Sequence, residues 1–203
     1  MKIKHLGYLL ACGALFGSTA WAGDVDKLVE TCGTCHGKAG VNSELDVPTI
    51  GGSSAEYLKT SLTEYKNKER PCLETKVREG AKKDSKTDMC QVVSELTEAD
   101  IQQLAAHFAA QKFERSPQTV DATLAAKGQG IHDKNCEKCH SEGGSLASDD
   151  AAILAGQKIA YLEQALKQLS EGKRPMNKKM KPKIEALDSA DLQALVHFYG
   201  SAH

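Results

Sequence analysis

Apolar residues recur at helical spacing at two corresponding places in the chain. One set of positions lies at 57, 58, 61, 62 and 65, and the other at 161, 162, 165, 166 and 169. Steps of three and four residues place such side chains on one face of an α-helix. Each half also ends in a second helical pattern, opened by Thr97 or Asp188, which are residue types that favour helix N-caps. Because no convincing strand pattern occurs, the expected fold class is all-α.

These matching patterns belong to an internal duplication. Residues 32–71 match residues 136–175 at an offset of 104, and residues 89–108 match residues 180–199 at an offset of 91. The fall in offset places a 13-residue insertion in the first copy, between Leu73 and Asp88. We expect two domains, residues 23–115 and 116–203, with a linker around Pro117.

The N-terminus reads as an export signal. Lys2 and Lys4 precede an apolar run at residues 6–16, and Ala20-Trp21-Ala22 supplies a small-x-small cleavage site. The run is shorter than the roughly 20 residues needed to cross a bilayer, so no stable membrane span is expected. We therefore interpret residues 1–22 as a signal peptide and expect a periplasmic protein. A lipid-modified Cys12 is the alternative.

Charge gives little indication of a nucleic-acid partner. Without Lys2 and Lys4, 24 basic residues remain against 27 acidic ones, and charged residues make up only 26% of the chain. Residues 23–117 hold 13 basic and 16 acidic residues, whereas residues 118–203 hold 11 of each. After cleavage six cysteines remain, and an oxidising compartment disfavours free thiols.

Four of these cysteines form two copies of Cys-x-x-Cys-His, which is the signature of covalent haem c. Two cysteines at this spacing can each bond one vinyl group of a porphyrin, and the adjacent histidine can bind the iron. A zinc site would need closer cysteine pairs, and a thioredoxin-like pair would need strands. Disulfides within each motif would leave the histidines unexplained. The residues are Cys32, Cys35 and His36 in the first copy and Cys136, Cys139 and His140 in the second.

Methionine is the expected second axial ligand of each iron, since thioether ligation suits small electron carriers. Met89 and Met180 coincide in the repeat alignment, whereas Met176 aligns with Cys72 and is expected to pack beside the haem. Two filled axial positions leave no open site for a substrate. We therefore expect electron transfer and not an enzyme. The Pro48 carbonyl is expected to hold the His36 ring, a role that Ala152 takes in the second copy.

The remaining histidines are weaker candidates for ligands, and we expect them to lie at the surface or at interfaces. They are His107, His132, His197 and His203. The remaining cysteines, Cys72 and Cys90, flank the insertion and have no counterparts in the second copy. In an exported protein a disulfide that closes this loop is the expected state, and a thiolate ligand or redox thiol is the alternative.

At these residues the chain resembles dihaem class I cytochromes c of the cytochrome c₄ type over its whole mature length. It resembles more closely the haem subunit of flavocytochrome c sulfide dehydrogenase, in residues 132–144, 153–157 and 174–180. The resemblance implies two tandem class I domains, each wrapped around one haem, and a flavoprotein partner that oxidises sulfide. The insertion and the Cys72–Cys90 pair depart from that family's pattern.

We therefore expect an electron-accepting haem subunit of a sulfide-oxidising flavoprotein. The alternatives are a free-standing cytochrome c₄-like shuttle between respiratory complexes and a terminal oxidase or reductase, and a dihaem peroxidase. Basic residues near Met180 are expected to ring the second haem and to attract an acidic electron acceptor. They are Lys173, Arg174, Lys178, Lys179, Lys181 and Lys183.

Overall fold

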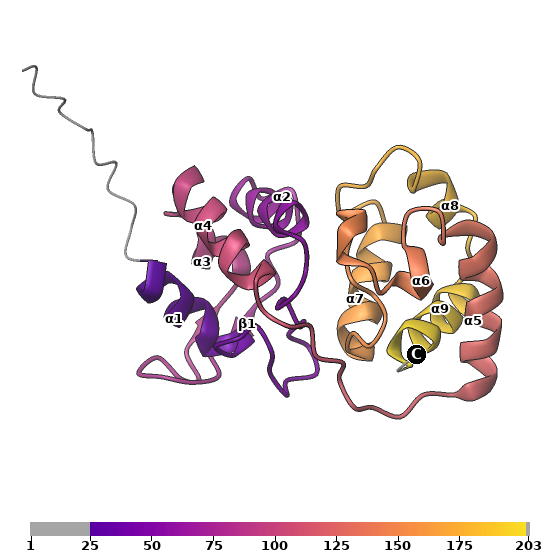
Figure 1. The fold of residues 1–203 in the computed structure, drawn as a ribbon, viewed down its shortest axis with the longest axis horizontal. Helices are drawn as coiled ribbons and strands as arrows, with labels where there is room; N and C mark the ends of the chain where they lie inside the picture. Colours follow the sequence, from indigo (N-terminus) through magenta and orange to yellow (C-terminus); the bar gives the residue numbers. More distant parts are fainter. Residues whose placement is uncertain (1–24, 202–203) are drawn as a thin grey trace, which may run out of the picture.

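The computed structural model describes residues 25–201, which form two helical domains lying side by side (Figure 1). Residues 111–121 connect them and contain neither helix nor strand. The expected domain boundary between residues 115 and 116 falls within this connection. The expected signal peptide, residues 1–22, and the alternative lipid site Cys12 lie outside the described residues. Within residues 25–201, no helix has both the length and the apolar character that a membrane span requires.

The first domain folds around one hydrophobic core. Its elements are α1 (Val25–His36), α2 (Ala55–Lys66), β1 (Thr75–Lys76), β2 (Lys86–Thr87), α3 (Met89–Val93) and α4 (Glu98–Ala109). Helix α4 packs against both α1 and α2. The core takes Leu58 from α2, Val93 from α3 and Leu104 from α4, so the helical face expected from the sequence is the buried one.

The second domain repeats this plan. Its elements are α5 (Ala122–Asn135), α6 (Ser141–Gly144), the 3₁₀ turn η1 (Ala147–Asp149), α7 (Ile159–Ser170), α8 (Lys181–Glu185) and α9 (Ser189–Gly200). Its core contains Leu162 and Leu195, which match Leu58 and Leu104 in the first domain. Helices α5 and α9 cross closely at Gly128, where a Cβ atom would lie only 2.1 Å from the Ala194 carbonyl oxygen.

The expected helix starts are present in both domains. The Thr97 side chain accepts a hydrogen bond from the Asp100 amide, and the Asp100 carboxylate accepts one from the Thr97 amide, which forms a capping box. Asp188 accepts from the Asp191 amide at the start of α9. Such caps satisfy backbone donors that have no partner inside the helix. The prediction of two tandem, mostly helical domains is confirmed.

The expectation that the chain contains no strand is wrong in one small place. Strands β1 and β2 pair antiparallel, with Thr75 opposite Thr87 and Lys76 opposite Lys86. Both lie within the segment that carries the insertion, which folds back on itself as a short hairpin. With two residues in each strand, the hairpin is too short to show an alternating sequence pattern.

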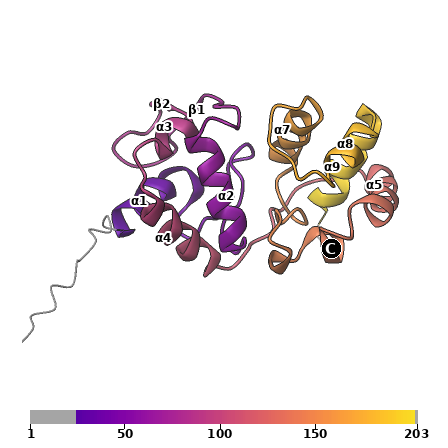
Figure 2. The ribbon, with the colours of Figure 1, turned by 90° about the horizontal axis from the view of Figure 1, so that it is seen from above.

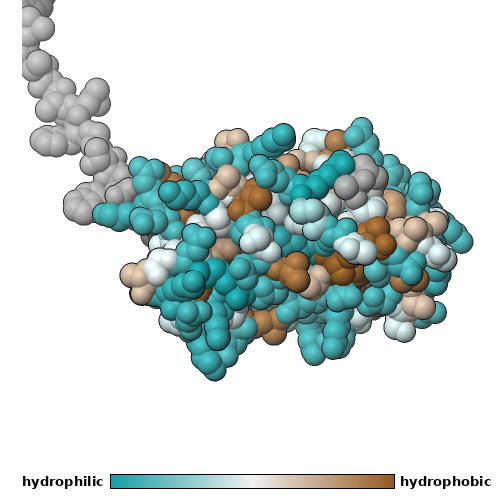
Figure 3. Space-filling model, turned by 90° about the horizontal axis from the view of Figure 1, so that it is seen from below, coloured by the Kyte–Doolittle hydropathy of each residue, from teal (hydrophilic) through white to brown (hydrophobic). Residues whose placement is uncertain are grey.

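Helices α2 and α7 face each other across the boundary between the domains, as both views show (Figures 1 and 2). These two helices occupy matched positions in the duplication. The surface in Figure 3 is mainly hydrophilic, with hydrophobic groups in small separate patches. Among the described residues, only Leu45 and Leu73 are large exposed hydrophobic side chains.

Candidate haem-binding sites

The first Cys-x-x-Cys-His motif forms the last turn of α1. Cys32 and His36 are four residues apart, so they lie on the same helix face. His36 is buried, and its Nδ1 atom lies 3.1 Å from the Pro48 carbonyl oxygen, as expected from the sequence. Because that contact uses Nδ1 as the donor, Nε2 is left as the atom that can bind iron.

The second motif begins directly after a helix, α5. Cys136 caps the C-terminus of α5, and the amides of Cys139 and His140 both donate to the Cys136 carbonyl, each at 3.0 Å. The two cysteines and the histidine therefore lie in one tight turn. The His140 Nδ1 atom is buried and makes no hydrogen bond of close geometry among the described residues, but the Ala152 carbonyl acts on this ring as the Pro48 carbonyl does on His36.

Burial keeps both histidines in the form that binds a metal. It is the main cause that lowers the pKa of His36 and of His140, although the Pro48 carbonyl opposes it for His36 and the Ala152 carbonyl for His140. A neutral imidazole has a lone pair for iron, whereas a protonated imidazole has none. Burial also raises the pKa of Cys32 to about 11, which disfavours a reactive thiolate there.

The structure leaves the motif cysteines free for thioether bonds. Cys32, Cys35, Cys136 and Cys139 are all unpaired, so neither motif forms an internal disulfide. Within residues 25–201, only one His, Cys and acidic cluster has metal-ligand spacing, and two of its members, Cys72 and Cys90, are bonded to each other. These observations disfavour a zinc site and a disulfide within either motif.

The methionines lie against the expected cores. Met89 begins α3 and packs against the core of the first domain. Met180 precedes α8 and packs against the core of the second domain, but Met176 does so as well. Only the repeat alignment therefore favours Met180 over Met176 as the second axial ligand.

Each domain has one arginine, at matched repeat positions, that could contact a propionate of a haem. Arg70 is buried, with Nε 2.8 Å from the Glu64 carboxylate and its guanidinium 5.1 Å from the Tyr65 ring centre. The Nε atom of Arg174 is buried without a hydrogen-bond partner among the described residues. Both arginines act electrostatically on Tyr161, whose pKa is raised chiefly by burial. Arg70 already has Glu64 as an anionic partner, whereas the buried Nε atom of Arg174 needs an acceptor that a haem propionate would supply.

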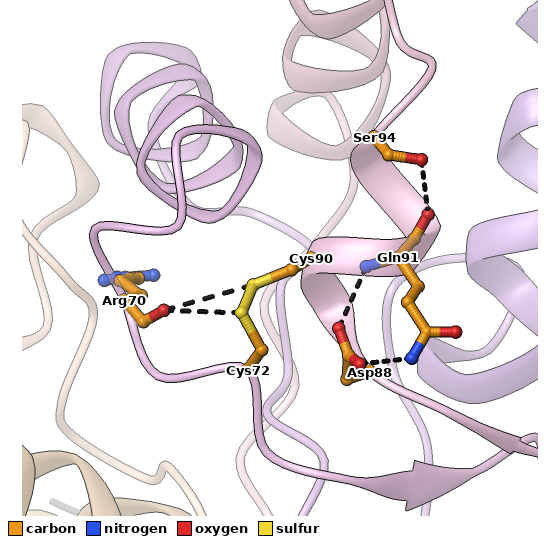
Figure 4. The surroundings of a disulfide bond; sticks show 6 residues. All are labelled: Arg70, Cys72, Asp88, Cys90, Gln91 and Ser94. Atoms are coloured by element: carbon orange, nitrogen blue, oxygen red, sulfur yellow. Dashed lines mark hydrogen bonds between the residues drawn. A yellow bond between two sulfur atoms is a disulfide. The ribbon is translucent and has the colours of Figure 1, made fainter.

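A disulfide joins Cys72 to Cys90, which are 18 residues apart in sequence. The Arg70 carbonyl oxygen lies 3.8 Å from the Cys72 sulfur and 4.0 Å from the Cys90 sulfur (Figure 4). Asp88 caps α3 by accepting from the Gln91 amide. The bond therefore connects the segment that carries the buried Arg70 to the helix that begins with Met89.

The insertion also reaches the first haem motif. The amides of Arg78 and Glu79 donate to the Thr34 carbonyl at 3.2 Å and 3.0 Å. Thr34 lies between Cys32 and Cys35, so the hairpin covers one side of the attachment turn. The second copy has no such segment, and Cys139 is exposed.

His132 was expected to lie at a surface or an interface, and that expectation is wrong. Its side chain is only 1% exposed within the second domain. Nδ1 lies 2.9 Å from the Tyr199 hydroxyl oxygen and Nε2 lies 2.5 Å from a Glu137 carboxylate oxygen. The match of His132 in the first copy is Leu28, which cannot form these bonds. The sequence signal for this network is the loss of repeat symmetry at these positions.

Known families match each half of the chain separately. A family model described as cytochrome c matches residues 24–111. A second, described as cytochrome c oxidase, cbb3-type, subunit III, matches residues 123–198. Both matches contain one Cys-x-x-Cys-His motif, in agreement with the duplication.

Relatives match the whole chain. Cytochrome c4 of Pseudomonas aeruginosa is 26% identical over 215 residues, covering 98% of this chain and 99% of the relative. Reduced recombinant cytochrome c4 from Pseudomonas stutzeri has a TM-score of 0.69 and 25% identity, covering 90% of this chain and 100% of that one. Cytochrome c4 from Acidithiobacillus ferrooxidans, described as supporting complex-induced tuning of electron transfer, has a TM-score of 0.67 and 25% identity, covering 84% and 98%.

A further solved structure, thiosulfate dehydrogenase from Marichromatium purpuratum, has a TM-score of 0.67 at 22% identity and shows a likeness of fold alone. This chain covers 39% of that protein, and 87% of this chain is matched. These relatives give no support to the expected sulfide dehydrogenase subunit. The duplicated motifs, the two helical domains and the matches along both halves agree with one another. The chain is therefore a cytochrome c4-like protein of two cytochrome c domains, with two covalently attached haem c groups.

Proposed function

We propose that this dihaem electron carrier works in the periplasm as a free-standing shuttle between respiratory complexes and a terminal oxidase or reductase. The observation that carries the proposal is the repeated site, in which each domain holds the histidine of its Cys-x-x-Cys-His motif, buried for His36 and half-buried for His140, together with a methionine packed against its core. Bound haem supplies an iron that takes up and releases one electron. The chain supplies both axial ligands, which leaves no position for a substrate and favours a carrier over a peroxidase or another enzyme.

The attachment residues follow from the motifs. Cys32 and Cys35 would bind the first haem and Cys136 and Cys139 the second, with His36 and Met89, and His140 and Met180, as axial ligands. The buried Arg70 and the half-buried Arg174 would hold propionates and would offset their charge. None of these roles asks a side chain to move during electron transfer, which suits a rigid carrier.

Haem content tests this proposal first. The protein matured in cells with intact haem attachment should have the mass of a polypeptide that begins at Gly23 plus two haems. Covalent attachment should survive denaturation, because thioether bonds do not depend on the fold. A single haem, or haem that separates on a denaturing gel, would contradict the proposal.

A flavoprotein partner is the second candidate, and it rests on the resemblance of residues 132–144, 153–157 and 174–180 to the haem subunit of a sulfide dehydrogenase. Purification of the tagged holoprotein from its own cells tests it. A flavin spectrum that co-elutes in equal amount with the cytochrome would favour the subunit role. A flavin-free eluate that still reduces an isolated oxidase would favour the shuttle.

The proposed acceptor surface lies on the segment around α8 in the second domain (Figure 1). The five lysines of the expected ring, Lys173, Lys178, Lys179, Lys181 and Lys183, are all exposed. Arg174 does not belong with them, because it is only partly exposed and its Nε atom is buried. Lys173 pairs with Glu171 and Lys181 with Glu185. Within residues 25–201, Lys178 and Lys179 have no ion pair, so they are the strongest cationic pair in this cluster.

Reversing these two charges should slow electron transfer to an acidic acceptor. We expect Lys178→Glu/Lys179→Glu to lower the second-order rate severalfold at low salt, because opposite charges steer the encounter and salt screens them. Stopped-flow reduction of the acceptor measures the rate. The matched control is Lys82→Glu/Lys83→Glu, which places the same change on the exposed hairpin of the first domain. Equal slowing in both variants would mean that net charge, and not this surface, sets the rate.

A further inference from the structure

In the first domain, Val47 and Thr49 hydrogen-bond side chains of the second domain, whereas Pro48 between them contacts His36 of its own domain. The Pro48 carbonyl faces the Nδ1 atom of His36 at 3.1 Å, within the first domain. The Val47 carbonyl accepts from the Lys158 ammonium of the second domain at 2.7 Å. The Thr49 amide donates to the Gln157 side chain at 3.0 Å, and the Thr49 carbonyl accepts from it at 2.9 Å. The second domain thus fixes both neighbours of the carbonyl that orients His36.

The linker holds this clamp in position. The Gln118 side chain donates to the Gln157 carbonyl at 2.7 Å and accepts from the Ile159 amide at 2.9 Å. It also donates to the Gly200 carbonyl at 2.9 Å, at the end of α9. The backbone on both sides of Lys158 is therefore tied to the linker and to the last helix, which prepares the lysine to enter the first domain.

Lys158 is an unusual place for a charge. Its side chain is 1% exposed, and its ammonium also donates to the Asn42 side chain at 2.7 Å. Burial of a charged group is costly unless hydrogen bonds and opposite charges compensate it. Burial lowers the pKa of Lys158 to about 8, while the carboxylates of Glu44 and Asp46 oppose that shift. The lysine therefore carries its charge at neutral pH.

The second domain contacts the histidine-orienting loop of the first domain, but within residues 25–201 the first domain makes no matching contact to the second. The matches of Gln157 and Lys158 in the first domain are Ser53 and Ser54, which are too short to reach across. Among the described residues, no side chain of the first domain hydrogen-bonds the equivalent loop around Ala152. The charge of Lys158 also contributes to lowering the pKa of His36, which shows that it is felt at the ligand of the first haem.

We propose that Lys158 is a positioning residue through which the second domain sets the reduction potential of the first haem. The inference rests on the proposed function, in that His36 binds the first iron. A fixed positive charge beside the proximal loop favours the reduced iron, because reduction removes one positive charge from the haem. The clamp at Val47 and Thr49 keeps the Pro48 carbonyl, and with it the His36 ring, in one orientation.

Removing the charge should therefore lower the potential of the first haem alone. We expect Lys158→Gln to shift the reduction equilibrium of that haem by about tenfold toward the oxidised form, which is about 59 mV for a one-electron couple. The second haem should stay unchanged. The matched control is Lys167→Gln, which removes an exposed charge from α7, the helix that Lys158 precedes, and should shift neither haem.

The wild-type protein offers an independent readout. As pH rises through about 8, Lys158 loses its proton and the potential of the first haem should fall, whereas in Lys158→Gln this step should be absent. The other charged or titratable groups near the lysine are Glu44 and Asp46, Arg78 that pairs with both, and His36. In the holoprotein His36 would be held by the first iron.

The experiment is a spectroelectrochemical titration of the full holoprotein over a series of pH values, with the two haems resolved by magnetic resonance. Protection of the Thr49 amide against hydrogen exchange reports whether the domains stay docked in the variant. Equal shifts of both haems, or a first-haem potential that is flat between about pH 7 and pH 9 in the wild type, would overturn the inference. Haem content is measured first, since fewer than two haems would refute the proposed function and not this inference.

Discussion

The Met89→Ala variant is expected to lose the iron–sulfur bond of the first haem and to keep that of the second. Met89 begins α3 and packs against the core of the first domain, and alanine offers no thioether to iron. Loss of a thioether ligand lowers the potential of the affected haem and opens one axial position. In the reduced holoprotein, each methionine bound to an iron would give its own upfield-shifted methyl proton signal. One of the two signals should disappear.

The reciprocal variant, Met180→Ala, should remove the other signal and leave the first. Met176→Ala is the matched control, because Met176 packs against the same core of the second domain only four residues away. It should keep both signals, with at most a small loss of stability from the cavity. Loss of the second signal in Met176→Ala, with its retention in Met180→Ala, would show that the repeat alignment is wrong at this point.

The elements that could be predicted from the sequence are those that depend only on residues close together in the chain. The helix that starts at Thr97 and the one that starts at Asp188 each need only a capping side chain and apolar residues at helical spacing. The duplication strengthened each such prediction, because the same signals occur twice. The attachment motifs were equally local, since three residue types at fixed spacing define them.

The features that could not be predicted depend on residues far apart in the sequence. Lys158 contacts Asn42 and Val47 across separations of 116 and 111 residues, and before the fold is known it reads as an ordinary lysine at a helix start. Arg174 was grouped with neighbouring lysines because its sequence position suggested exposure. Arg174 is only partly exposed, and its charge acts on Tyr57 of α2 and Tyr161 of α7, which lie outside residues 171–183.

The two domains share a plan but differ in how their histidine rings are held. His36 is anchored by Pro48, and the loop around that carbonyl is gripped by the second domain through Lys158. The Ala152 carbonyl acts on His140 through a looser contact that no other domain grips among the described residues, and this domain also has a buried His132 bonded to Tyr199. Different ligand environments on one duplicated fold are expected to give the two irons different potentials, which would give electrons a preferred direction between them.

Breaking the disulfide should weaken the first domain selectively. The Cys72–Cys90 bond closes a segment of 18 residues, and closing a loop of this size stabilises a fold by about 3 kcal/mol in the chain-entropy picture. We expect Cys72→Ala/Cys90→Ala to lower the free energy of unfolding of the first domain by about that amount. Because the bond links the Arg70 segment to the helix that begins with Met89, the iron–methionine bond of the first haem should be lost earliest.

Denaturant titration of the oxidised holoprotein measures this effect, with the two methionine signals of rapidly reduced samples reporting on each domain. The second domain serves as the internal control, since it lacks these cysteines and should unfold at the same denaturant concentration in both proteins. If both domains lost stability equally, the disulfide would be supporting the contact between them, and its assignment to the Met89 loop would be wrong.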